Sequence, residues 1–228
     1  MKIYQRWIKA QKAEYKHYKR RKHKWECLEN YKKFLVNTFN LDFSIFKNKD
    51  VLEVGCGAYG IIHYIPNARI KVGIDPLASR YIGLYDDLRT YHITGIGEKL
   101  PFRDSKFDIV ICGNVLDHVI NPHDVIYEMY RVLKNDGLLI LWLHTFELPL
   151  TLRKFLNILD KPHPYHLQAV EVLSMLTDVG FTIEFLNIIK HQAKILEVIG
   201  KVSFISGLKH AIAKILNMNN VYVLARKR

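Results

Sequence analysis

The chain has 228 residues, of which 49% are apolar, enough for one principal core with appendages but too few for two full-sized domains. No stretch reaches the roughly 18 consecutive apolar residues of a membrane-spanning helix, and no apolar segment follows the lysine-rich N-terminus, so we expect a cytoplasmic protein without a transmembrane segment. Cys27, Cys56 and Cys112 form no Cys-x-x-Cys pair, which argues against a disulfide framework and against a cysteine zinc site.

The net charge of +12 is concentrated at the two ends of the chain. Residues 1–34 hold twelve Lys or Arg against three Glu, a net of +9, and the last three residues add +3. The body between them is therefore close to neutral. We expect this basic charge to serve a partner rather than the reaction.

The N-terminal segment from Lys2 to about Phe39 contains neither Gly nor Pro, and its large apolar residues recur in steps of three, four or seven. This is a helical period, and the opposite face is rich in lysine. We therefore predict a basic amphipathic helical extension over residues 1–39, followed by a single domain over residues 40–228.

After Asp50, short apolar runs alternate with helical or turn-rich stretches, a pattern typical of an open parallel sheet wrapped by helices. Helices are predicted after Asn121-Pro122, ending at Asn135-Asp136-Gly137, and from about Leu167 to Val179. Residues 190–219 are predicted to form a helical insertion of one or two amphipathic helices. The predicted strands are Val51–Val54, Lys71–Ile74, Tyr91–Thr94, Asp108–Cys112, Leu138–Leu143, Phe181–Ile189 and Val221–Ala225.

A glycine-rich loop, Gly55-x-Gly57-x-x-Gly60, follows the first strand, and Asp75 ends the next one. Glycines let a backbone approach a ligand closely, and a carboxylate at this place can bind a ribose diol, so the pattern alone also fits a dinucleotide oxidoreductase. Glu53 separates the two interpretations. It would repel a pyrophosphate, but it suits a ligand that carries an ammonium group.

Five blocks in order resemble the class I S-adenosylmethionine-dependent methyltransferases, in the type 11-like branch that acts on small molecules and lipids. They are Glu53–Gly57, Gly73–Pro76, Leu100–Val110, Asn114–Val119 and Arg131–Gly137. The resemblance implies an α/β fold, a Rossmann-like three-layer sandwich with a mostly parallel seven-stranded sheet whose last strand is antiparallel. It also implies S-adenosylmethionine as the cofactor. The cofactor-binding residues it implies are Glu53, Gly55, Cys56, Gly57, Tyr59, Asp75, Pro76, Gly97, Glu98, Gly113 and Asn114.

One position departs from the family, because Ile96 stands where an Asp often binds the adenine amino group. Gly97 and Glu98 are the substitutes we expect there.

Catalysis by such an enzyme depends mainly on aligning a nucleophile with the activated methyl group. A general base would help a hydroxyl or an ammonium acceptor, and His118 and His144 are the candidates near that face. The proline-stiffened loop with His163, Tyr165 and His166 is a candidate substrate contact, without a predicted metal. The expected reaction is methyl transfer to an O or N nucleophile, rather than to carbon, of a small or amphiphilic acceptor.

The basic N-terminal segment leaves alternatives open. Its Lys and Arg residues, interleaved with His17, Tyr18, His23 and Trp25, could follow RNA phosphates with rings available for stacking, or lie on an anionic membrane surface. They could equally be a solvated face. An RNA methyltransferase and a non-catalytic RNA-binding protein are thus alternatives to the small-molecule enzyme.

Overall fold

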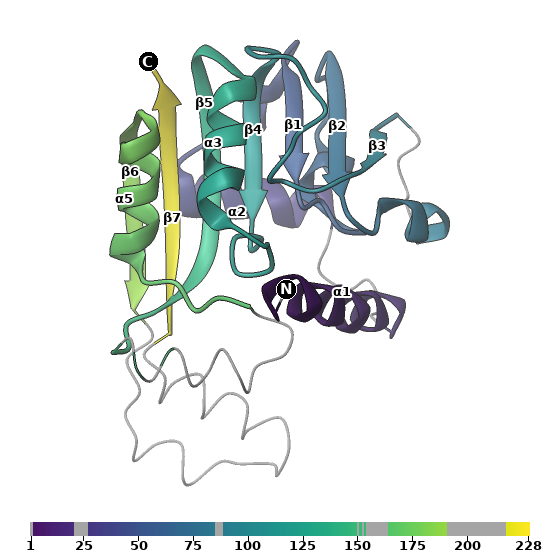
Figure 1. Ribbon diagram of the computed structural model, residues 1–228. Coiled ribbons are helices and arrows are strands. Elements are labelled where there is room, and N and C mark those ends of the chain that lie inside the picture. The colour runs from purple at the N-terminus through teal and green to yellow at the C-terminus, as the bar shows by residue number, and fades with distance from the viewer. Residues whose placement is uncertain are drawn as a thin grey trace, which may run out of the picture.

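The computed structural model describes residues 2–20, 27–84, 89–149, 151, 153, 164–190 and 218–228 (Figure 1). A seven-stranded sheet in the order β3-β2-β1-β4-β5-β7-β6 forms the middle layer. Helices α3 and α5 cover one face of this sheet, and α2 covers the other (Figure 1). The prediction of a three-layer α/β fold is confirmed.

The strands are β1 (Asp50–Val54), β2 (Ile70–Asp75), β3 (Tyr91–Thr94), β4 (Phe107–Gly113), β5 (Leu133–Phe146), β6 (Phe181–Lys190) and β7 (Met218–Lys227). The α-helices are α1 (Lys2–Arg20), α2 (Leu28–Phe39), α3 (Pro122–Val132) and α5 (Ala169–Val179). Short 3-10 turns are η1 (Phe43–Phe46), η2 (Ile61–Tyr64), η3 (Ala78–Arg80) and η4 (Ile82–Leu84).

The central strands are parallel, and β7 runs antiparallel to both β5 and β6, as predicted for the last strand. All five residues of β1 are buried, because helices cover both faces of the sheet at this place. All parallel strands therefore end at the same edge, and this edge carries the loops that form the site described below.

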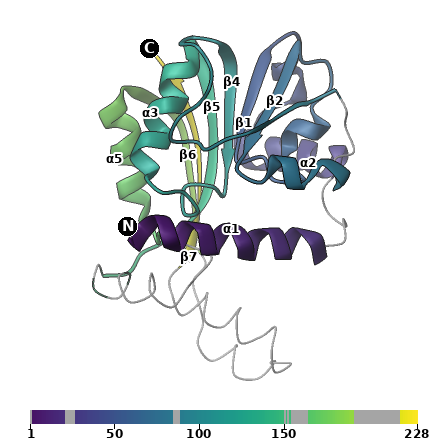
Figure 2. The ribbon, with the colours of Figure 1, turned by 45° about the vertical axis from the view of Figure 1, so that its right-hand side comes forward.

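The helix predicted from Lys2 to about Phe39 is present as α1 and α2, with residues 21–26 outside the described part. α2 buries Tyr31, Leu35 and Phe39 in the core cluster on its face of the sheet. α1 instead runs across the carboxyl ends of the strands (Figure 2). The two halves of the basic segment thus have different environments.

The helix after Asn121-Pro122 ends at Val132, three to five residues before the predicted end at residues 135–137. Leu133 is extended and pairs with Phe107 of β4, which draws it into β5. Its side chain is fully buried in the core, so the apolar period continues from the helix into the strand. Periodicity alone could not separate the two elements.

The predicted helical insertion over residues 190–219 lies largely outside the described residues. At its margins, Lys190 ends β6, and β7 begins at Met218, three residues before the predicted start of the last strand. Within the described parts of the chain, no helix combines the length and the apolar character needed to cross a membrane.

Arg131 fastens the loop before β4 to α3. Its guanidinium donates to both carboxylate oxygens of Glu128, at 2.7 and 2.8 Å, and to Asp104 at 2.7 Å. It also donates to the carbonyls of Leu100 and Phe102. The side chain of Glu128 is itself nearly buried, so its charge depends on this arginine.

We predict that Arg131→Gln lowers the free energy of unfolding by about 2 kcal/mol, because it leaves the Glu128 carboxylate without its cation. Urea denaturation monitored by circular dichroism measures the change. The matched control is Arg103→Gln at an exposed position of the same loop, which should stay within about 0.5 kcal/mol of wild type. Equal effects of the two variants would contradict this role of Arg131.

Candidate functional site

A cavity of about 480 Å³ opens at the carboxyl ends of the parallel strands. This is the edge at which open α/β sheets bind ligands. The residues predicted to bind a cofactor lie in four separate parts of the sequence, and the fold brings every one of them to the wall of this cavity. They are Glu53, Gly55, Cys56, Gly57, Tyr59, Asp75, Pro76, Gly97, Glu98, Gly113 and Asn114.

The glycine loop needs glycine at two positions for reasons visible in its backbone. Gly55 and Gly57 have φ angles of +70° and +53°, which side chains disfavour. A Cβ on Gly55 would collide with the Val115 side chain, and one on Gly57 would lie 2.7 Å from the Tyr18 hydroxyl oxygen. The loop therefore presents bare backbone to the cavity.

Asp75 ties this loop to the end of β2. Its carboxylate accepts hydrogen bonds from the backbone N–H of Gly57 at 3.0 Å and of Leu77 at 2.8 Å. Burial raises the pKa of Asp75 to about 6, against the lowering effect of these two bonds. The carboxylate is thus held at the cavity wall in a fixed orientation.

Glu53 is buried beneath the loop, with only 3% of its surface exposed. Its carboxylate accepts a hydrogen bond from Ile62 N–H at 2.9 Å, and a Cβ on Gly60 would collide with it. Burial raises the pKa of Glu53 to about 8. A carboxyl of this kind favours a positively charged ligand, because an adjacent cation restores its ionised form.

The cavity is acidic although the chain is strongly basic. Its described lining contains four carboxylates, those of Glu14, Glu53, Asp75 and Glu98, and neither Lys nor Arg. This lining suits a cationic ligand and disfavours a pyrophosphate.

Helix α1 forms one wall of the cavity, and this role was not predicted. Trp7, Gln11, Glu14 and Tyr18 line it, in steps of four, three and four that place them on one helical face. The Tyr18 ring packs against Tyr59 and Tyr81 at centroid distances of 5.6 and 5.3 Å. In the sequence, the helical recurrence of apolar residues predicts that one face of this helix is covered, but it does not show which part of the protein that face contacts.

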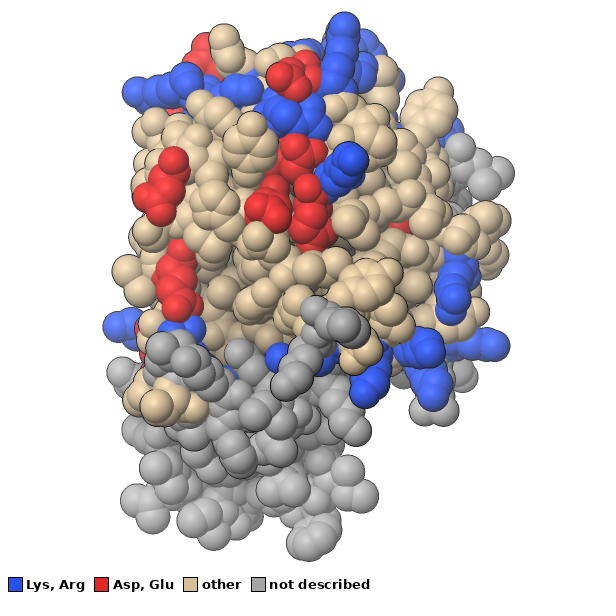
Figure 3. Space-filling model, viewed as in Figure 1, with Lys and Arg blue, Asp and Glu red and all other residues tan. Residues whose placement is uncertain are grey.

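The opposite face of α1 points to solvent. Lys9, Lys12, Lys16 and Lys19 are all exposed and follow one another in steps of three, four and three. Figure 3 shows basic side chains gathered at the lower right of the molecule, where Figure 1 places α1. These four lysines thus lie outside the cavity.

The far half of the cavity is formed by β5 and β7, where aromatic rings meet a polar pair. Trp142 pairs with Tyr222 and His144 pairs with Asn220 in the antiparallel register, so the four side chains share one face of the sheet. All four line the cavity, and Phe34 of α2 packs against Trp142 and Tyr222. Asn220 and Tyr222 were not predicted, because they belong to a strand distant in the sequence.

The two predicted bases occupy different parts of the cavity. His144 Nδ1 lies 2.6 Å from Oδ1 of Asn220, and Asn220 also hydrogen-bonds to the Tyr222 hydroxyl. An amide oxygen only accepts, so this bond requires a proton on Nδ1 and leaves Nε2 able to accept one. His118 lines the cavity between β4 and α3, with Nε2 3.8 Å from Asp117 Oδ1.

Glu98 lines the cavity, but one of its oxygens already accepts hydrogen bonds from Ile120 N–H at 2.6 Å and Asn121 N–H at 3.2 Å. Ile96 and Gly97 lie beside it in the lining. The carboxylate of Glu98 therefore fastens the start of α3, and Gly97 offers its backbone.

The predicted substrate loop is only partly described. His163 lies outside the described residues, while Tyr165 and His166 are placed but are not among the residues that line the cavity. The Tyr165 hydroxyl donates to the Ile120 carbonyl at 2.6 Å, and His166 is buried against the Phe146 ring. Their contacts hold the loop to its neighbours.

Comparison with known proteins identifies relatives of the central part of the chain. Residues 52–141 match a family model described as a methyltransferase domain. Over 102 residues, the chain is 31% identical to a ubiquinone biosynthesis O-methyltransferase of Glaesserella parasuis, covering 40% of this chain and 43% of that protein. Over 108 residues, it is 32% identical to the thiol S-methyltransferase TMT1B of Mus musculus, covering 44% of each. The chain thus spans less than half the length of these curated relatives.

Solved structures extend the likeness of the fold. A geranyl diphosphate methyltransferase, in complex with GPP and sinefungin, superposes with a TM-score of 0.61 at 15% identity. The match covers 88% of this chain and 78% of that one, so it reaches well beyond the matched domain.

We predict that the pH dependence of stability reports on Glu53. Because the folded protein holds this proton up to about pH 8, whereas a solvated Glu releases it near 4.5, the native state binds more protons over this interval. The free energy of unfolding of the ligand-free protein should therefore fall as the pH rises from about 4.5 to about 8.

Urea denaturation across this range is the measurement, with Glu53→Gln as the variant. The glutamine removes one titrating group, so its stability should fall less steeply with pH than that of wild type. Glu29→Gln, at an exposed position on α2, should keep the wild-type slope. A Glu53→Gln slope equal to wild type would show that Glu53 titrates normally.

Proposed function

Because the chain carries the domain of a class I S-adenosylmethionine-dependent methyltransferase, we propose that it transfers the methyl group of this cofactor to an oxygen or nitrogen of a small or amphiphilic acceptor. The observation that carries the proposal is the division of the cavity. One half has the glycine loop with the buried Glu53 and the partly buried Asp75, and the other half is an aromatic compartment with a histidine.

The first half has the chemistry that the cofactor needs. The backbone of the glycine loop can approach it closely, and Glu53 would face its ammonium group. Asp75 would accept hydrogen bonds from the ribose diol, while Gly97 and Glu98 would border the adenine. The bound cofactor supplies a methyl group on a sulfonium, which is already activated for transfer.

The second half would hold the acceptor. Phe34, Trp142 and Tyr222 offer apolar surface to a ring or a chain, and the acidic lining favours an acceptor without negative charge. His144 would take the proton from the acceptor at Nε2, since Asn220 holds Nδ1 in its protonated form. Asn220 is then a positioning residue that sets the tautomer of the base.

Helix α1 would separate this chemistry from water. Its cavity face contributes Trp7 and Tyr18, so both reactants would lie under a wall whose described lysines are on its outer face. Exclusion of water strengthens the interactions inside and protects the reactive sulfonium. The likeness to a quinone-pathway O-methyltransferase over 102 residues supports a small acceptor of this kind.

The RNA alternative finds less support in this geometry. Tyr18, one of the rings considered for stacking on bases, lines the cavity instead of the basic face. His23 and Trp25 lie outside the described residues. A dinucleotide oxidoreductase is disfavoured by the acidic lining of the cavity, whose described residues include four carboxyl groups and neither Lys nor Arg to bind a pyrophosphate.

We predict that isothermal calorimetry detects S-adenosylmethionine binding to the full chain, and that Asp75→Ala weakens it by about 10- to 100-fold. The change removes a charged hydrogen-bond acceptor worth about 1.5–3 kcal/mol. Asp124→Ala, at an exposed position in the first turn of α3, is the control and should bind like wild type. No heat with wild type, or equal affinity in both variants, would refute the cofactor site.

We further predict that His144→Gln lowers the rate of methyl transfer by about 100-fold without changing the affinity for S-adenosylmethionine, because a general base acts only on the acceptor. The assay offers panels of phenols and of amines to the full chain and measures release of S-adenosylhomocysteine. His123→Gln, on the exposed start of α3, should retain the wild-type rate.

An unchanged rate in His144→Gln would show that the acceptor needs no base at this position. If neither panel leads to release of S-adenosylhomocysteine, although the protein binds the cofactor, the proposed acceptor class is wrong. The two results separate the role of the histidine from the identity of the acceptor.

A further inference from the structure

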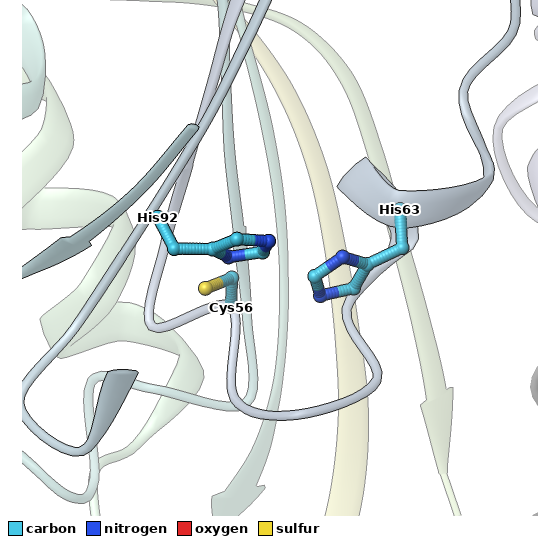
Figure 4. Close-up of side chains that lie close together, drawn as sticks. All are labelled: Cys56, His63 and His92. Atoms are coloured by element: carbon cyan, nitrogen blue, oxygen red, sulfur yellow. The ribbon is translucent and has the colours of Figure 1, made fainter. Parts of the chain in front are cut away.

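Three side chains with metal-binding atoms meet beside the glycine loop (Figure 4). Cys56 lies between Gly55 and Gly57 of the loop, His63 lies in η2, and His92 lies on β3. The thiol sulfur of Cys56 and one ring nitrogen of each histidine all lie within 4.8 Å of one another. Among the described residues, this is the one group of three or more such side chains that could hold a metal ion.

The cluster is built into the interior. Cys56 and His63 are 2% and 7% exposed, and His92 is half-buried. The two imidazole rings stack at a centroid distance of 5.0 Å with an interplanar angle of 25°. Figure 4 shows the three side chains close together, so the side chains would have to turn slightly for one nitrogen of each ring and the sulfur to face a common ion.

One glycine of the sheet, Gly73, leaves the space that the Cys56 side chain occupies beside His92. Gly73 of β2 lies directly beside His92 in the parallel register. A Cβ on Gly73 would lie 2.7 Å from the Cys56 sulfur, so any side chain at this position would displace the thiol. The missing side chain provides the space in which Cys56 and His92 approach each other.

The ligand set selects the class of ion. One thiolate and two imidazoles bind Zn²⁺ and related soft or borderline ions, whereas Mg²⁺ and Ca²⁺ need oxygen ligands. In a zinc site the ligand atoms lie about 3.5 Å apart, so small side-chain rotations would close the present spacing. Three protein ligands leave the fourth tetrahedral position for water.

The surrounding charge also favours a cation. The carboxylates of Glu53 and Asp75 both act electrostatically on Cys56. A divalent ion bound beside them would favour their ionised forms, which would offset the positive charge that a single thiolate leaves on the ion.

We propose that Cys56, His63 and His92 form a binding site for one zinc-class transition-metal ion, held directly beside the glycine loop. On binding, the sulfur forms a bond to the metal and releases its proton to solvent, while both imidazoles bind as neutral ligands. This inference goes beyond the proposed function, and it requires neither cofactor binding nor methyl transfer.

The test is titration of the reduced, metal-free full chain with Co²⁺, whose spectrum reports the ligands directly. Saturation at one equivalent is expected, with visible bands of a four-coordinate ion and a near-ultraviolet thiolate-to-cobalt band. Zn²⁺ should then displace the cobalt and abolish both features. Cys56→Ser should lose the thiolate band, and His63→Asn and His92→Asn should each weaken binding by at least about 100-fold.

Two variants serve as matched controls because their side chains are exposed and lie outside the cluster. Cys27→Ser and His123→Asn should both reproduce the wild-type titration. Circular dichroism establishes that each variant is folded. Gly73→Ala provides an independent variant that keeps all three ligands but fills their space, and it should also weaken binding.

Failure of wild type to saturate with Co²⁺, or a thiolate band that survives in Cys56→Ser, would overturn the proposal. The cluster would then be a packing contact of two rings and a thiol. Because the titration is done without S-adenosylmethionine, its result is independent of the outcome of the cofactor-binding experiment.

Discussion

The turn from β1 into the glycine loop is the constraint on which the rest of the site depends. Gly55 N–H donates to the Ile74 carbonyl at 2.8 Å, and Gly57 N–H donates to Asp75 at 3.0 Å, so the end of β2 shapes the loop. With this turn in place, the bare backbone faces the cavity and Glu53 is enclosed beneath it. The same turn brings Cys56 to His63 and His92. Loss of either glycine would disturb all three arrangements, because both have positive φ angles.

The two faces of helix α1 differ in side chains and in environment. Its cavity face, with Trp7 and Tyr18, completes the wall of the site, while its lysines are directed to solvent. Acidic and basic side chains are therefore separated by this helix. A cationic ligand would meet carboxylates inside the cavity, whereas Lys9, Lys12, Lys16 and Lys19 lie on the outer face of the helix that covers it. Composition alone, with a net charge of +12, would have suggested the opposite electrostatic character for the site.

The sheet and the cofactor half of the site were predictable from sequence because their signals are local. Buried parallel strands appear as short apolar runs, and Gly55, Gly57 and Asp75 follow such runs at fixed distances. The acceptor half was not predictable in the same way. Asn220 and Tyr222 reach it through antiparallel pairing with β5, across a long separation in the chain, and Trp7 reaches it through the docking of α1. The spacing of Cys56, His63 and His92 likewise matches no local metal motif, since β3 joins the others only through the sheet.

The acid lining of the cavity bears on how a turnover would end. Transfer of the methyl group converts the sulfonium of the cofactor into a neutral thioether, while the proton lost by the acceptor would pass to His144 and then to solvent. The spent cofactor thus carries one positive charge fewer within a space walled by Glu14, Glu53, Asp75 and Glu98. The electrostatic attraction that draws the charged reactant in is therefore weaker for the spent product. In a methyltransferase with this cavity, departure of the product is favoured by the charge balance of the chemistry, before any part of the protein moves.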